Sequence, residues 1–357
     1  MKVIFHNGAN KTGSTSIQIA FHKHLDLLAD HNVFYPVFPG GVPSEHWQLR
    51  ALEKDAIFPS FIRARMGNDT GPVLGAVVKE ILSKTVDMAR RSDGTILIST
   101  ESHMNDQALL AIKGFFEAHV PNLTILVYIR PRAEFFVSGL QHNLRHDFTS
   151  RTNVTGDQHL VKLNTLDKVF GKDNVKVRIF DRRVLQNGDI VSDFRAWLER
   201  HINFELPEFR ATLSVNQSIS AASCAAVLRV KEMLSGDDAE RRFLAISKLI
   251  TRYDAKLGGA GMKLSSDMIQ RLHTTNHVES WNQHVARTEH THEEKATLFL
   301  VPQQGDLPAI EEADVRKWVH SFWDEGHVRS LIDLAARSET PPPQAVLDDL
   351  RQLISTV

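Results

Sequence analysis

The first eighteen residues constrain the fold of this chain more than any other part of the sequence. An apolar run over residues 3–6 leads into a loop with glycines at Gly8 and Gly13, and a helical pattern begins near Ile17. A strand, a glycine loop and a helix N-terminus together form an anion cradle, because backbone N–H groups point into the loop and the helix end carries about half a positive charge. The sequence therefore predicts a phosphate site at the start of an α/β fold.

Lysine, glycine and hydroxyl side chains of this loop are the candidate phosphate ligands. Gly13 allows close approach of the main chain, and Lys11 supplies a point charge. The remaining candidates are Gly8, Thr12, Ser14, Thr15 and Ser16. In a Walker A loop the lysine directly follows the second glycine, whereas here Ser14 holds that place and Lys11 precedes Gly13 by two residues.

A second candidate anion site follows the apolar run at residues 123–129. Arg130 stands at the end of this expected strand, and Pro131 suits the first turn of a helix. Ser138 comes about two turns further along that helix, roughly 10 Å at about 1.5 Å per residue. A guanidinium holds two phosphate oxygens at once, so Arg130 and Ser138 could grip one dianion from two sides.

The two motifs together resemble those of sulfotransferases that use 3′-phosphoadenosine-5′-phosphosulfate (PAPS). The run from Lys11 to Thr15 is similar to their 5′-phosphosulfate loop, and the spacing of Arg130 and Ser138 matches their 3′-phosphate motif. The resemblance implies PAPS as donor and transfer of a sulfuryl group to a hydroxyl or amine of a carbohydrate or small metabolite. No metal is expected, because the histidine pairs at helical spacing lack a third ligand with defined spacing. It covers residues 1–225, and the adenine-binding segment of the cytosolic aryl and steroid members is not recognisable in this sequence.

The resemblance also implies catalytic residues. Lys11 would stabilise the charge on the leaving phosphate. Glu101, which follows the expected strand at residues 95–100, is the first candidate for the base, and His103 is the alternative. Glu101 could instead cap the next helix. If the strand order follows the family, this strand neighbours the one that carries Arg130.

Strands and helices alternate through the first two hundred residues. Strands are expected at residues 3–6, 95–100, 123–129 and 175–180, with helices between them, which predicts βαβ units and a covered, central parallel sheet. The resemblance implies that this α/β core is a P-loop-like three-layer αβα fold. Residues 36–72, rich in proline and glycine, are expected to be an irregular insertion outside the core. We expect the α/β core to span residues 1–205 and a helical C-terminal lobe, packed on the core, to span 206–357. Helices of that lobe are expected at residues 220–234, 238–257, 266–287, 311–337 and 344–354.

Composition sets limits on the function. Lysine and arginine number 42 against 43 acidic residues, so no overall charge draws the protein to nucleic acid or a membrane surface. The single cysteine, Cys224, suits a reducing compartment, and no apolar run is long enough for a membrane span, so we expect a cytoplasmic protein. The alternatives are a nucleotide kinase or NTPase with a P-loop fold, or a catalytically silent nucleotide-binding protein. The sequence indicates neither the acceptor nor the oligomeric state.

Overall fold

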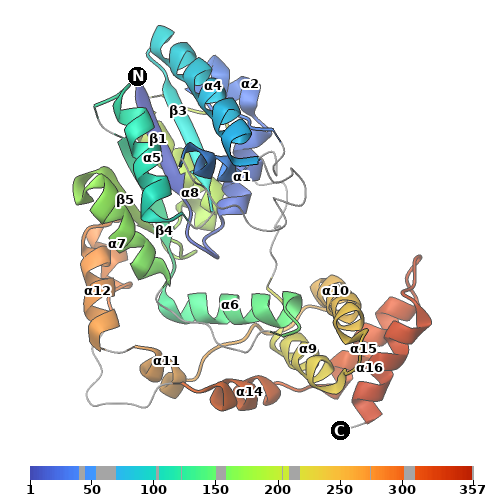
Figure 1. The fold of residues 1–357 in the computed structure, drawn as a ribbon. Coiled ribbons are helices and arrows are strands. Elements are labelled where there is room, and N and C mark those ends of the chain that lie inside the picture. Colours follow the sequence, from blue (N-terminus) through green and yellow to red (C-terminus); the bar gives the residue numbers. More distant parts are fainter. Residues whose placement is uncertain are drawn as a thin grey trace. The chain divides into compact units, whose positions relative to one another are not determined.

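The computed structural model describes residues 1–39, 45–53, 70–101, 104–121, 123–149, 158–202, 204–208, 218–273, 275–300 and 310–355. Within these residues the strands form one parallel sheet in the order β2-β3-β1-β4-β5 (Figure 1). The strands are β1 (Lys2–Asn7), β2 (Val33–Phe34), β3 (Thr95–Thr100), β4 (Leu123–Ile129) and β5 (Val175–Ile179).

Contacts within the chain define two compact units, each built from three segments. The sheet unit comprises Met1–Pro131, Asp157–Val215 and Asn276–Val301, and the helical unit comprises Arg132–Gly156, Asn216–Thr275 and Pro302–Val357. These units are interleaved along the chain, and the domains expected at 1–205 and 206–357 stay a prediction.

Helices account for most of the remaining described residues. Those of the sheet unit are α1 (Ser14–His22), α2 (Leu25–Asp30), η1 (Trp47–Leu52), α4 (Thr70–Arg91), α5 (Asp106–Glu117), α7 (Gln158–Phe170), η2 (Lys172–Asn174), η3 (Gln186–Gly188), α8 (Ile190–Ile202), α12 (Thr275–Ala286) and α13 (His292–Ala296). Those of the helical unit are α6 (Arg132–His146), α9 (Ala221–Met233), α10 (Ala239–Leu257), α11 (Ser266–Leu272), α14 (Glu312–His320), α15 (Glu325–Ala336) and α16 (Gln344–Ser355).

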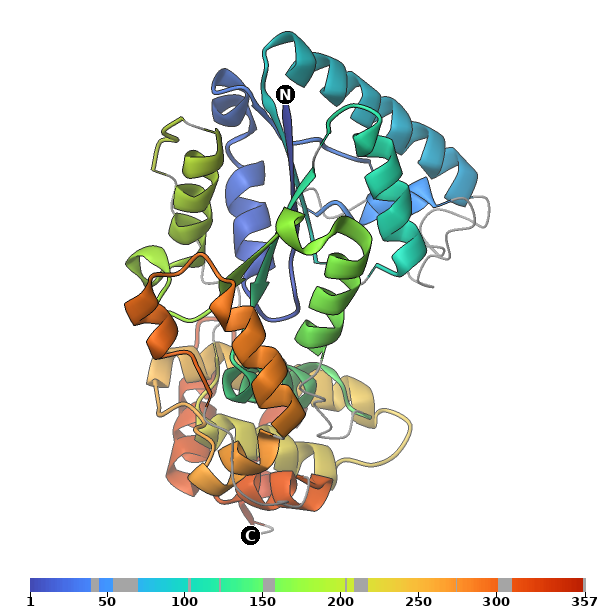
Figure 2. The same cartoon turned by 90° about the vertical axis from the view of Figure 1, so that its left-hand side faces the viewer.

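The sheet is buried on both faces, as its nearly continuous apolar strands require. Successive residues of β1 point to opposite faces, so Val3 and Phe5 join one core cluster and Ile4 joins another. The first cluster is covered by α4, α5, α7 and α12, and the second by α1 and α8. Figure 2 shows α4, α5 and α7 on one side of the sheet and α1 and α8 on the other. The predicted three-layer α/β fold is confirmed.

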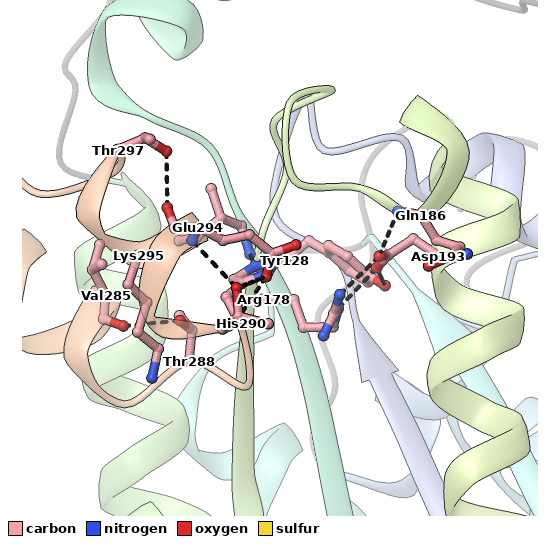
Figure 3. A network of polar contacts seen from close by, with 12 residues as sticks. Tyr128, Arg178, Gln186, Asp193, Val285, Thr288, His290, Glu294, Lys295 and Thr297 are labelled. Carbon is pink, nitrogen blue, oxygen red and sulfur yellow. Dashed lines mark hydrogen bonds and ion pairs between the residues drawn. The ribbon is translucent and has the colours of Figure 1, made fainter.

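A buried ion pair joins β5 to α8 (Figure 3). Arg178 donates two hydrogen bonds to the carboxylate of Asp193 at 2.8 and 2.7 Å, and the Tyr128 hydroxyl donates a third at 2.7 Å. Burial alone would raise the pKa of Asp193, but the hydrogen bonds and charge of Arg178, together with hydrogen bonds from Tyr128 and Gln186, outweigh it and keep that pKa below its ordinary value. The pair thus stays ionised and ties the edge of the sheet to its neighbouring helix.

The four strands expected from the sequence are all present, and β2 is an addition. β2 was missed because two residues carry no periodic signal. The expectation that β3 and β4 are adjacent strands was wrong, because β1 lies between them and pairs with both. The expectation that residues 36–72 stay outside the core was also wrong for the described part, since Trp47 and Leu49 of η1 are buried in the first core cluster.

The helices expected after residue 205 are present, but two of the segments are broken. The expected helix at 266–287 is split into α11 and α12, and the one at 311–337 into α14 and α15. The second part of the first segment, α12, belongs to the sheet unit, where Trp281 and Val285 pack with residues of the sheet. Beyond it the backbone N–H of Ile179 in β5 donates to Nε2 of His290 at 2.9 Å.

Candidate functional site

The loop between β1 and α1 has the backbone shape that its glycines allow. Lys11 and Gly13 adopt left-handed conformations, with φ of 63° and 78°. A Cβ atom on Gly8 would lie 1.9 Å from Oγ of Ser14, so no larger residue fits there without displacing the serine. The loop therefore folds tightly back on the first turn of α1.

Side chains bind every carbonyl oxygen from Gly8 to Lys11. Lys162 donates to the carbonyl of Gly8. Nε2 of His159 donates to that of Asn10 at 2.8 Å, and Nη1 of Arg130 donates to that of Lys11 at 3.1 Å. The carbonyl of Ala9 accepts from the Thr12 hydroxyl at 2.6 Å. In a planar trans peptide the C=O and N–H groups point in opposite directions. The hydrogen bonds to these carbonyls therefore turn the N–H groups of the same peptides away from the side chains that bind the carbonyls.

One hydrogen-bond donor of the loop backbone already has a carboxylate as its acceptor. The carboxylate of Glu101, just beyond β3, accepts a hydrogen bond from the backbone of Lys11. The hydroxyl of Ser14 is 1% exposed, and its Oγ has no hydrogen-bond partner among the residues that the structure describes. A buried hydroxyl without a partner is costly. A phosphate oxygen in the loop would fit both this hydroxyl and the loop N–H groups.

Two carboxylates and two lysines surround the loop. Glu101 also donates its backbone N–H to Oε1 of Glu45 at 3.3 Å. Burial, and next the Glu45 charge, raise the pKa of Glu101, whereas the charges of Lys11 and Lys162 act against this rise. Burial lowers the pKa of Lys162 to about 8, and the two carboxylates act in the opposite direction. This arrangement brings the Glu101 carboxylate towards the pKa range that a general base needs.

Arg130 brings the second motif to the same edge of the sheet. β1 and β4 are parallel neighbours, so their carboxyl ends lie together. Besides its bond to Lys11, the guanidinium of Arg130 lies 5.3 Å from the ring centroid of Phe180. The same ring would come within 3.0 Å of a Cβ atom on Gly13. The ring of Phe180 therefore lies beside both Arg130 and the glycine loop.

The predicted site residues fall into three groups. One group lies together at the loop: Gly8, Lys11, Thr12, Gly13, Ser14, Thr15, Ser16, Glu101 and Arg130. Ser138 lies half-buried on α6 in the helical unit, and its pairing with Arg130 remains a prediction. His103 lies outside the described residues, so the choice between it and Glu101 stays open.

Three further residues of the site, Lys162, His159 and Glu45, were not predicted from the sequence. Lys162 and His159 are three residues apart at the start of α7, whose later inward positions Leu163 and Leu166 are buried and apolar. A pair of basic residues on the otherwise apolar inner face of a helix is the signal that could have identified them. Glu45 follows a proline- and glycine-rich stretch and carries no such signal.

Comparisons with known proteins add little to this geometry. No family model matches the sequence, and no curated protein is similar to it. A crystal structure of a sulfotransferase from Alicyclobacillus acidocaldarius is similar over 64% of this chain and 90% of that chain, with 13% sequence identity and a TM-score of 0.38. A likeness at this level carries no argument about function.

The described residues contain neither a helix suited to crossing a membrane nor a cluster suited to a metal ion. None of the described helices combines the length and the apolar character that crossing a membrane requires. In the same residues, no group of three or more His, Cys, Asp or Glu side chains is placed so that it could hold a metal ion.

Proposed function

We propose that this protein is a PAPS-dependent sulfotransferase that transfers a sulfuryl group to a hydroxyl or amine of a small-molecule or carbohydrate acceptor. The observation that carries the proposal is the 3.1 Å hydrogen bond from Arg130 to the carbonyl of Lys11. This bond brings two cationic motifs together. A donor with phosphates at the 5′ and 3′ positions of one nucleoside requires two such motifs. The resemblance of each motif to those of the sulfotransferase family supports the same proposal.

In this proposal the loop holds the 5′ end of the donor and Arg130, with Ser138, holds its 3′-phosphate. PAPS supplies an activated sulfuryl group and leaves as 3′-phosphoadenosine 5′-phosphate (PAP). The loop N–H groups and the hydroxyls of Ser14, Thr15 and Ser16 orient the 5′-phosphate. Lys11 neutralises the charge that develops there, a contribution worth roughly 3 kcal/mol by comparison with a single oxyanion-hole donor.

Glu101 is the proposed base. Its carboxylate lies at the loop, where burial and the neighbouring Glu45 raise its pKa and so make its ionised form a stronger base. An ionised carboxylate at that position can take the proton of the attacking hydroxyl or amine. His103 is the alternative base.

Calorimetric titration with PAP tests the donor part of the proposal. We expect binding in the micromolar range, and a loss of about tenfold or more in Arg130→Met, which removes a charged bidentate ligand. Arg90→Met is the matched control, because Arg90 is an exposed arginine at the end of α4. An absence of PAP binding to the unmodified protein would contradict the proposal.

Incubation with PAPS and a panel of hydroxyl- and amine-bearing acceptors, followed by mass spectrometry, tests the transfer. A sulfated product that disappears in Glu101→Gln, with PAP binding retained, is the expected result. Binding of PAP without any product would favour a catalytically silent nucleotide-binding protein. Magnesium-dependent turnover of ATP, without PAP binding, would favour a kinase or NTPase.

A further inference from the structure

One buried histidine connects the two anion motifs. His159 is 4% exposed and lies in the first turn of α7. Its Nδ1 accepts a hydrogen bond from the backbone N–H of Arg130 at 3.1 Å, and its Nε2 donates to the carbonyl of Asn10 at 2.8 Å. A single imidazole ring thus spans the end of β4 and the middle of the glycine loop.

These partners determine the state of the ring. A backbone N–H can only donate, so Nδ1 carries no proton, and a carbonyl can only accept, so Nε2 carries one. A protonated ring would bring two N–H groups against each other at the Arg130 end. Burial lowers the pKa of His159 to about 4, so the neutral ring that both bonds require is the form present at neutral pH.

We propose that His159 is a positioning residue that fixes the distance and orientation between the loop and Arg130, so that one ligand with two phosphates is held at both ends. The inference rests on the proposed function, because it concerns how the same site tells a bisphosphate from a monophosphate. The direct bond from Arg130 to the carbonyl of Lys11 is a second link between the same two elements. Asn10 and Lys11 are consecutive, so the two links fix the loop at adjacent peptides. With both links intact, the glycine loop and Arg130 are held at one fixed distance from each other.

This arrangement predicts a distinctive pattern of affinities. A monophosphate uses one end of the site and can adapt to a shifted partner, whereas a bisphosphate must fit both ends at once. Loss of His159 should therefore weaken binding of PAP more than binding of adenosine 5′-monophosphate or adenosine 3′-monophosphate. A general loss of structure would weaken all three ligands by the same factor.

Calorimetry with these three ligands tests the inference. In His159→Phe, which keeps a ring and removes both hydrogen bonds, we expect PAP to bind about tenfold more weakly and each monophosphate less than about threefold more weakly. His159→Gln, which can keep one of the two bonds, should lie between this variant and the unmodified protein, and serves if the phenylalanine variant does not fold. His290→Phe is the matched control, since His290 is also buried and also accepts a bond from a backbone N–H at the end of a strand.

The outcomes separate the role of His159 from the proposed function. Equal losses for all three ligands, or no loss at all, would overturn the role of His159 while leaving the proposed function intact. A selective loss of PAP binding in His290→Phe would overturn it as well. If the unmodified protein binds PAP no more tightly than the monophosphates, the proposed function itself is wrong, and the inference fails with it.

Discussion

Replacement of Lys162 by methionine should make the protein more stable. Burial lowers the pKa of Lys162 from 10.5 to about 8, which corresponds to a cost of about 3 kcal/mol for keeping the ammonium group charged at neutral pH. Methionine fills a similar volume without a charge, but the carbonyl of Gly8 then loses its donor, which costs about 1 kcal/mol. We therefore expect Lys162→Met to gain about 2 kcal/mol in unfolding free energy at pH 7.

The pH dependence provides the sharper test. Because the pKa of Lys162 is lower in the folded than in the unfolded protein, the unfolded chain binds more protons between about pH 8 and 10.5. Through this residue, the stability of the unmodified protein should rise with pH across that window, and the rise should be absent in Lys162→Met. Urea denaturation at a series of pH values measures both quantities.

A matched control separates charge burial from the loss of a lysine contact. Lys113 of α5 also donates to a backbone carbonyl, that of Val169 at 2.9 Å, and pairs with Glu117 at 3.6 Å. Lys113→Met should lose a little stability rather than gain it. If Lys162→Met is less stable than the unmodified protein at pH 7 and keeps the same dependence on pH, burial of the charged Lys162 side chain costs no unfolding free energy. The reasoning is then refuted.

Three other substitutions test separate parts of the structure. Gly8→Ala places a Cβ atom on Ser14, and should cost about 1–3 kcal/mol of stability and abolish measurable PAP binding; a variant that binds PAP normally would contradict the loop geometry. Glu101 has a raised pKa, so sulfuryl transfer should fall as the pH drops through a value above the ordinary 4.5, and a rate that is flat there, or one that persists in Glu101→Gln, would argue against this base. Asp193→Asn leaves the buried Arg178 without its counter-charge, and should lower the unfolding free energy by about 3–5 kcal/mol, whereas a loss below about 1 kcal/mol would show that the pair is unimportant.

The sequence was sufficient to predict those parts of the site that depend on neighbouring residues. The glycine loop and Arg130 each follow an apolar strand directly, and parallel strands bring their carboxyl ends to one edge of the sheet. Their position at a common edge therefore followed from the fold class, whereas the pairing of β1 with β4 depends on the strand order. The same holds for Glu101 at the end of β3.

The missed residues depend on packing between distant segments. Lys162 and His159 reach the loop across about 150 positions of the chain, and no spacing rule predicts which turn of α7 faces the loop. The burial of η1 was missed for a related reason. Prolines and glycines in the surrounding stretch suggested irregular structure, but Trp47 and Leu49 have enough apolar surface to be drawn into the core.

The return of residues 276–300 to the sheet unit bears on how this protein is made. Trp281, Val285 and Leu298 pack in the same core cluster as the first strand, and His290 takes an N–H at the end of β5. A ribosome that has synthesised only the first two hundred residues has produced all the strands that the structure describes, but not the segment that completes their packing. The nascent sheet must wait for roughly a hundred further residues, with apolar surface and an open edge available to other chains in the meantime. Expression as a fragment that stops before α12 should for this reason give aggregated material.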